Sequence, residues 1–306
     1  MIKLPTISGV APRDDELTSW RSYLELVKPR VVALMMFTVA VGMVLSTPEL
    51  PAWRVLVFGV LGIGLVAASA AAINHVIDQR IDAQMLRTRN RPLPRGLLDE
   101  VQASVFAAAL SLAGASLLLW ATNALCTALT LASLVGYAVI YSLVLKPRTP
   151  QNIVIGGAAG AAPPLLGWVA VTGQIDPGAL VLFLIILMWT PPHFWALAIH
   201  RRDDYARAGV PMLPVVRGVS HTAKRILQYA IALWLVSLLP TAIGLAGLPY
   251  LLGAWLLGAR FVMLAWRLRR DSSLAMPTFR FSIFYLAAIF ALLLADHLFA
   301  AWPAPA

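Results

Sequence analysis

Three polar side chains stand four residues apart at the end of a long apolar run: Asn74, Asp78 and Asp82. At 100° per residue, positions i, i+4 and i+8 of an α-helix drift only about 80° around its axis, so all three project from one face. Two such carboxylates repel each other unless a cation lies between them. Mg²⁺ prefers one or two carboxylates together with phosphate oxygens. The spacing therefore predicts half of a diphosphate site, with Asp78 and Asp82 as metal ligands.

Basic side chains follow this motif and provide partners for the remaining negative charge of a diphosphate. Arg87 and Arg91 come shortly after it, and guanidinium groups bind phosphate oxygens through paired hydrogen bonds. A second group of donors further along the chain contains Lys146, Arg148 and Asn152. Such a group suits an anion, although an ordinary basic loop of a membrane protein also explains it. These five residues are the candidate diphosphate ligands.

A second polar cluster follows another apolar segment, between residues 190 and 218. If the helix continues through the cluster, His193 and Asp204 lie within about 20° of one face, whereas Asp203 lies about 80° away. Asp204 is therefore the better candidate for a further metal ligand, with Asp203 and Tyr205 beside it in the second loop. Two prolines directly precede His193, and they predict irregular backbone that lines a cavity rather than lipid.

The elements that must position these residues are membrane helices. With 60% hydrophobic and 12% charged residues and a mean hydropathy of +0.79, the chain lies outside the range of soluble globular proteins. The stretches long enough to cross about 30 Å of hydrocarbon are 31–47, 53–75, 101–120, 123–145, 153–172, 178–199, 226–246, 248–266 and 281–301. The sequence predicts an all-α polytopic membrane protein with about nine transmembrane helices.

Lys and Arg residues are concentrated at one end of these predicted helices, whereas the loops at the other end carry only Arg54. By the positive-inside rule the N-terminus is cytoplasmic, and nine spans place the C-terminus outside. The net charge of +10 is explained by this topology and by attraction to anionic membrane lipid, so no nucleic acid partner is expected. Asp14 and Asp15 argue against a cleaved leader, and a bacterial inner membrane is the simplest location.

The predicted organisation is a short N-terminal segment followed by one transmembrane domain. Residues 1–27 form a cytoplasmic segment in which apolar residues at helical spacing, from Leu17 to Val27, predict an interfacial helix. Residues 28–301 form the transmembrane domain. Both polar loops run from acidic residues through a proline-flanked stretch to an Arg-Gly pair. This pattern predicts a repeat of helices 1–4 and 5–8 with a ninth helix appended.

The stretch from Asn74 to Asp82 resembles the NxxxDxxxD motif of the UbiA superfamily of membrane prenyltransferases. Four further strings resemble its protohaem IX farnesyltransferase branch: MLRTRNRPLPRG (85–96), KPRTPQN (146–152), TPPHFWALAI (190–199) and DDYARAGVPMLPVVRG (203–218). The chain departs from the wider superfamily in one respect. A second DxxxD motif is expected in the second polar loop. Here Asp203 and Asp204 are followed by Tyr205, and no acidic residue occurs four positions after either of them.

The resemblance implies a UbiA-like bundle of nine helices with a central cavity that faces the cytoplasm. It implies farnesyl diphosphate bound through Mg²⁺, haem b as the acceptor, and addition of water to give haem O and diphosphate. Asn74, Asp78, Asp82 and His193 would be catalytic, and His193 would ligate haem iron or orient the water. A hydrogen bond between helices is the structural alternative for His193. A downstream haem A synthase is an expected partner.

Three other classes of protein compete with this interpretation. A UbiA-type prenyltransferase acting on an aromatic or quinone precursor would share the donor site. A transporter would place its acids near the middle of the bilayer, whereas Asp78 and Asp82 lie at its edge. A transferase of the CDP-alcohol type would need an Asp-Gly pair and an Ala-Arg ahead of its acids, and the chain lacks this pattern.

Overall fold

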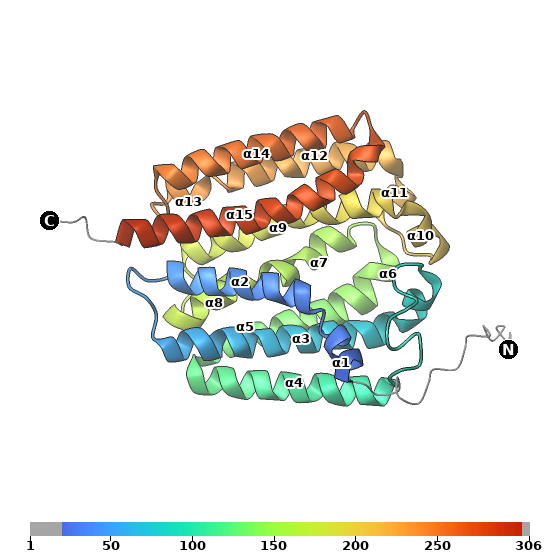
Figure 1. Ribbon diagram of the computed structural model, residues 1–306, viewed down its shortest axis with the longest axis horizontal. Helices are drawn as coiled ribbons and strands as arrows, with labels where there is room; N and C mark the ends of the chain where they lie inside the picture. The colour runs from blue at the N-terminus through green and yellow to red at the C-terminus, as the bar shows by residue number, and fades with distance from the viewer. Residues whose placement is uncertain (1–19, 302–306) are drawn as a thin grey trace.

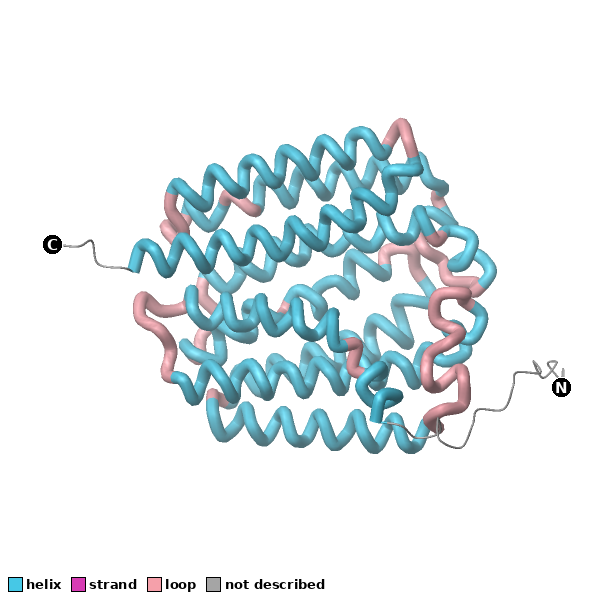
Figure 2. The backbone as a smooth tube through the Cα atoms, in the orientation of Figure 1, coloured by secondary structure: helices cyan, strands magenta, loops and turns pink. Residues whose placement is uncertain are grey.

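The computed structural model describes residues 20–301. In this range the chain is helical, with loops between the helices and no strand (Figure 2). The long helices, some formed by two consecutive segments, are α2 (Pro29–Leu45), α3 (Trp53–Gln84), α4 (Glu100–Ala121), α5 (Ala124–Val135) with η1 (Gly136–Leu145) and α6 (Lys146–Arg148), α7 (Asn152–Ala161) with α8 (Pro163–Thr172), α9 (Pro177–His200), α12 (Gly218–Val236) with α13 (Leu239–Ala242), α14 (Leu248–Leu268), and η2 (Ser272–Leu274) with α15 (Ala275–Ala301). The short helices are α1 (Trp20–Leu26), α10 (Arg202–Arg207) and α11 (Leu213–Val216).

Eight helices within the described residues are long and apolar enough to cross a membrane. A ninth span results when α1 and α2, which meet at 52°, are counted together. The prediction of an all-α protein with about nine membrane helices is confirmed. The helix α3 is longer than predicted, since it runs without a break from Trp53 to Gln84 and thus carries the whole Asn74 to Asp82 motif.

The long helices lie side by side, and their connections are grouped at two ends (Figure 1). The connections that follow α3, α6, α10 and α14 lie at one end, on the right of the view, and the end of α15 lies at the other. Because α15 contacts α2, α9 and α14, the last helix closes the bundle between its early and late halves. The repeat of two four-helix halves stays a prediction.

Helix α9 differs from the prediction of irregular backbone, which is wrong. The helix continues through Pro191 and Pro192 as far as His200. Proline removes one backbone hydrogen bond and crowds the preceding turn, but α7, α12 and α15 all pack against α9. Packing from three sides keeps the helix intact at these positions.

Helix α1 covers the described part of the predicted interfacial segment, and residues 17–19 lie outside the described range. One of its faces is buried. Leu26 is fully buried in a cluster with Ala72, Leu93 and Ala103, while Trp20 is 68% exposed. The position of α1 at a membrane interface stays a prediction, but its packing against α3 and α4 anchors the start of the bundle.

Candidate active site

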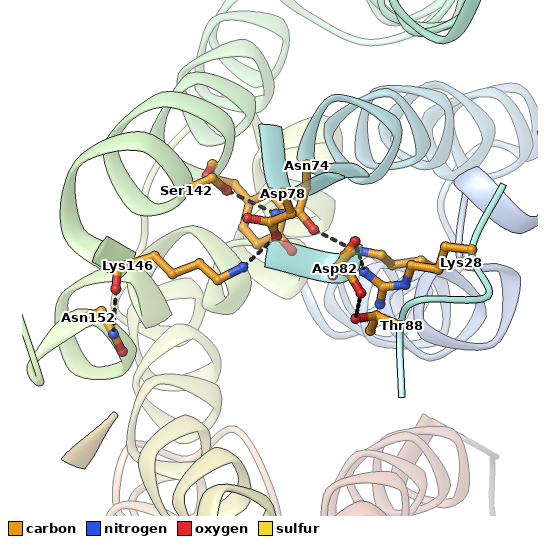
Figure 3. Close-up of polar contacts among 10 residues, drawn as sticks. Lys28, Asn74, Asp78, Asp82, Thr88, Ser142, Lys146 and Asn152 are labelled. Carbon is orange, nitrogen blue, oxygen red and sulfur yellow. Dashed lines mark hydrogen bonds and ion pairs between the residues drawn. The ribbon is translucent and has the colours of Figure 1, made fainter. Parts of the chain in front are cut away.

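The polar motif on α3 is buried as a unit. Asn74, Asp78 and Asp82 are only 3 to 4% exposed, and they lie along the end of one helix, as the four-residue spacing predicts. Asn74 donates from Nδ2 to Asp78 Oδ2 (2.7 Å) and to Ser142 Oγ (3.1 Å). Figure 3 shows Ser142 approaching the pair from a neighbouring helix. The amide thus holds one carboxylate in a defined orientation.

Three cations from separate parts of the chain meet this motif. Lys146 Nζ lies 2.5 Å from Asp78 Oδ2, and Lys28 Nζ donates to Asn74 Oδ1 at 2.6 Å (Figure 3). Arg91 Nη1 lies 2.6 Å from Asp82 Oδ2. Because Lys28 precedes α2, Arg91 follows α3 and Lys146 begins α6, the pairs tie three segments of the chain to the end of α3.

An unusual helix brings Lys146 to this place. Residues 136–145 form a π-helix, in which N–H groups bond five residues back. The Lys146 amide accordingly donates to Tyr141 O. Nine residues of α-helix would put Tyr137 and Lys146 on opposite sides, whereas at roughly 4.4 residues per turn they are only about 20° apart. The π-helix therefore presents a tyrosine and the lysine to the same cavity.

The polar groups surround a cavity of about 120 Å³. Its charged lining consists of four cations and two carboxylates: Lys28, Arg87, Arg91, Lys146, Asp78 and Asp82. Its other lining residues are Asn74, Met85, Tyr137, Tyr141, Phe194, Tyr205 and Met212. The rings of Tyr137 and Tyr141 stack with centroids 5.5 Å apart. A surplus of positive charge beside aromatic faces and methionines suits an anion that carries an apolar chain.

The carboxylate of Asp78 fits a metal ion. Its Oδ2 atom accepts from Asn74 and Lys146, while its Oδ1 atom is buried without a hydrogen-bond partner in the described structure. A buried carboxylate oxygen without a partner is costly, and a hard cation such as Mg²⁺ would satisfy it.

The second polar loop is arranged differently. Helix α9 ends at His200 and α10 begins at Arg202, so one helix does not continue through this loop as the sequence analysis assumed. Asp203 is exposed, whereas Asp204 is buried. Its carboxylate, however, pairs with Arg207 and, at 3.8 Å, with Arg201, and it does not line the cavity, although Tyr205 does. Among residues 20–301 no three His, Cys, Asp or Glu side chains are grouped as a metal site. The structure brings Asp78 and Asp82 together but leaves Asp204 apart.

His193 is buried where α9 packs against α15. Its Nδ1 atom is 2.7 Å from Ser282 Oγ on α15. The ring stacks on Trp189, with centroids 4.2 Å apart, and on Phe279, at 4.6 Å. The hydrogen bond between helices is therefore present. His193 itself does not line the described cavity, whereas the next residue, Phe194, does.

The remaining candidate diphosphate ligands fall into two groups. Arg87 and Arg91 line the cavity with Lys146. Arg148 is exposed and Asn152 is fully buried, and neither lines the cavity. Asn152 instead donates from Nδ2 to the backbone oxygen of Lys146 at 3.4 Å, so its contact is with the segment that carries the lysine.

Reasoning from the sequence missed Lys28, Ser142 and Tyr137. A signal for Lys28 was present, because the tripeptide Lys-Pro-Arg occurs twice, at 28–30 and at 146–148. Both lysines contact the Asn74 and Asp78 pair. For Ser142 and Tyr137 no comparable signal exists, since a π-helix shifts side chains away from the positions that α-helical periodicity predicts.

Comparisons with known proteins agree with this architecture. The UbiA prenyltransferase family matches residues 35–302. A protein from Thioalkalivibrio sulfidiphilus (strain HL-EbGR7), described as protoheme IX farnesyltransferase, is 60% identical over 281 residues, covering 91% of this chain and 93% of its own length. A protein of the same description from Hahella chejuensis (strain KCTC 2396) is 56% identical over 280 residues, covering 91% of this chain and 94% of its own.

Solved structures share the fold at low sequence identity. The digeranylgeranylglyceryl phosphate synthase structure matches with a TM-score of 0.76 and 19% identity, over 91% of this chain and 98% of that one. A UbiA homologue from Archaeoglobus fulgidus bound to DMAPP and Mg²⁺ matches with a TM-score of 0.62 and 16% identity, over 89% and 99%. The arrangement of membrane helices is thus common to all three chains.

Proposed function

The chain belongs to the UbiA prenyltransferase family, and on that premise we propose that it transfers a farnesyl group from farnesyl diphosphate to protohaem IX. The bond between farnesyl C1 and the diphosphate oxygen breaks, and C1 bonds to the terminal carbon of a haem vinyl group. Water adds its oxygen to the other vinyl carbon and releases a proton. The products are haem O and diphosphate.

One observation carries the donor half of this proposal. Two buried carboxylates, an amide and four cations gather at one cavity that also has aromatic walls. A diphosphate requires the cations, a metal ion requires the carboxylates, and an isoprenoid chain requires the apolar walls. The descriptions of the relatives at 56 to 60% identity support haem as the acceptor.

The ion pairs of the structure have a clear role in this proposal. Asp78 and Asp82 would exchange Lys146 and Arg91 for Mg²⁺, and the released cations would bind phosphate oxygens. Mg²⁺, when bound, neutralises charge on the departing diphosphate. Arg87 and Arg91 bind the same group from the loop, and Asn152 holds the backbone that presents Lys146. The solved homologue from Archaeoglobus fulgidus with Mg²⁺ and DMAPP supports the use of a divalent metal.

Breaking the allylic bond leaves positive charge on the farnesyl group, which must be kept away from water until the haem vinyl group reacts. Tyr137, Tyr141 and Phe194 line the cavity, and their ring faces stabilise a nearby cation. His193, held by Ser282 and stacked between Trp189 and Phe279, is proposed to bind the haem or to orient the water that adds to it.

A direct test incubates the purified protein with Mg²⁺ and farnesyl diphosphate together with either protohaem IX or an aromatic acid. Mass spectrometry then measures the products. We expect a haem product heavier by one farnesyl group and one hydroxyl group, and none without Mg²⁺. A prenylated aromatic acid without a haem product would instead support the enzyme class that prenylates quinone precursors.

The long apolar helices make the chain a multi-pass membrane protein. We propose the bacterial inner membrane, with the basic loops and the N-terminus in the cytoplasm, because of the positive-inside rule.

Single cysteines that replace Gln84, Ala206 and Glu49, all exposed, test this orientation. Labelling of the native cysteine should be low, since Cys126 is buried. Impermeant reagents should label the first two only from the cytoplasm and the third only from outside; labelling of Gln84 and Ala206 from opposite sides would refute this orientation.

A further inference from the structure

We propose that Lys28 is a further diphosphate-binding residue, and that the strained turn between α1 and α2 exists to present its ammonium group to the cavity. The proposal rests on the proposed prenyl transfer but assigns a role to a segment outside the residues that match the family, 35–302.

The side chain of Lys28 is placed for this role. It lines the cavity, and its Nζ atom donates to Asn74 Oδ1 at 2.6 Å. Figure 3 shows the chain extended from its backbone toward the α3 motif. An ammonium group has three donors, so the bond to Asn74 leaves two for a ligand. Because Asn74 also contacts Asp78, Lys28 stands next to the proposed metal ligand.

The backbone of Lys28 is strained. With φ 50° and ψ 60°, it is the only residue besides glycines with positive φ in the described range. This left-handed conformation is unfavourable in a residue with a Cβ atom, and the ring of Pro29 restricts Lys28 further. Glycine would have avoided the strain. Strain of this kind persists where the surrounding structure holds it, and it clusters at functional sites.

Packing on both sides holds the turn. On the N-terminal side, Leu26 is fully buried, and the ring of Tyr23 meets that of Phe106 edge-on at 4.9 Å. On the C-terminal side, Lys28 O accepts from the amides of Val31 and Val32 at 2.9 and 3.1 Å and so begins α2. The lysine therefore emerges from a fixed bend.

The charges around Lys28 favour an anion. The charges of Arg91 and Lys146 oppose that of Lys28, whereas those of Asp78 and Asp82 favour it. The cavity lining has four cations against two carboxylates, so positive charge is in excess before any metal binds. Like charges gathered in a partly buried place repel each other, and a diphosphate between them converts the repulsion into attraction.

The test compares four variants for binding of farnesyl thiodiphosphate, a poorly hydrolysed analogue, by calorimetry on the purified full chain with Mg²⁺. Lys28→Met keeps the length of the side chain but removes its charge. Lys28→Gly removes the charge and relieves the strained φ. Lys28→Arg keeps the charge. Arg30→Met removes an exposed cation of the same tripeptide and serves as the matched control.

We expect Lys28→Met and Lys28→Gly to weaken binding of the analogue about 10- to 100-fold, the range for losing a charge-assisted hydrogen bond. Lys28→Arg should recover most of the affinity, and Arg30→Met should stay within about twofold of the parent. Haem binding, measured by absorbance, should be unchanged in all four. Lys28→Gly should melt no lower than Lys28→Met, because glycine accepts the left-handed turn.

Two results would overturn the proposal. One is parent-like affinity for the analogue in Lys28→Gly. The other is a parallel loss of analogue binding, haem binding and melting temperature in both uncharged variants, which would make the lysine structural. If the parent protein itself bound no allylic diphosphate, the proposed function would fail instead.

Discussion

Asp78 and Asp204 are both buried carboxylates at the same end of the bundle, yet they find their partners at very different distances along the chain. Asp78 pairs with Lys146, and its neighbour Asn74 bonds to residues 46 and 68 positions away. Asp204 pairs with Arg201 and Arg207, each three residues away. Long-range pairs exist only when the helices assemble, whereas the pairs of Asp204 need only residues 201–207.

This difference in the range of the partners indicates two different roles for the buried carboxylates of Asp78 and Asp204. Residues of α3 and η1, together with Lys28 before α2 and Lys146 of α6, line a cavity. Their charges can exchange partners when a ligand enters. The pairs of Asp204 stabilise the first turn of α10 and its approach to α9, and they leave the cavity lined by Tyr205 instead. This comparison predicts that the long-range group performs the chemistry and that Asp204 supports its wall.

The largest expected effect comes from the α3 carboxylates. Asp78→Asn or Asp82→Asn should lower turnover about 10³-fold or more while the protein stays folded in the membrane, because a metal-ligand charge is lost without leaving a cavity. Asp204→Asn should lose less than about tenfold. Haem O formation measured by mass spectrometry at limiting Mg²⁺ checks both. A loss in folded Asp204→Asn equal to that in Asp78→Asn would break the comparison and make Asp204 a metal ligand.

The next largest effect is expected at Lys146, which pairs with Asp78. Lys146→Met should lower kcat/KM for farnesyl diphosphate roughly 100-fold, because a buried cation that neutralises the departing diphosphate is removed. Arg148→Met, two residues away and exposed, is the matched control and should change it less than about threefold. Steady-state kinetics with haem saturating measures both. Equal losses in the two variants would show that the basic loop acts only through its overall charge.

His193 tests whether residues with partners far along the chain also perform the chemistry in the second half of the molecule. Its partner Ser282 lies 89 residues away, so it belongs with the long-range group. His193→Ala should weaken haem retention about 30-fold, as seen by absorbance of the purified protein, while the farnesyl analogue still binds. A variant that keeps its haem spectrum but loses the analogue would place His193 in the donor site. A 30-fold weakening of haem retention is about what the loss of one contact to a charged or metal-bound group would cause.

The smallest effect probes the π-helix. A Cβ atom on Gly156 would lie 2.2 Å from Tyr141 Cδ2, whereas one on Gly160 would meet nothing within 4 Å. Gly156→Ala should therefore displace Tyr141 and lower kcat about tenfold, in the range for overpacking by one methyl group, and Gly160→Ala should not. Turnover with both substrates saturating distinguishes them. Equal turnover in the two variants would show that the tyrosine wall tolerates displacement.

Much of this protein could be predicted from local pattern. Hydropathy identified the spans, because each membrane helix must satisfy its own backbone and be apolar along its length. Four-residue spacing placed Asn74, Asp78 and Asp82 on one face, because the helical period acts over neighbouring residues. The same periodicity could not be carried on to Asp204, because α9 ends at His200 and a separate helix, α10, begins at Arg202.

Tertiary structure alone decided which groups meet. The α3 motif is contacted by Lys28, Ser142 and Lys146 because helices far apart in sequence pack together. Helical periodicity relates only neighbouring residues, so it cannot predict such contacts. Packing from three sides kept α9 helical through Pro191 and Pro192 against the local preference of proline. The sequence by itself determined the membrane helices and the polar face of α3, since both depend on neighbouring residues. Only the assembled bundle brought Lys28 and Lys146 to that face, because those pairs join residues tens of positions apart.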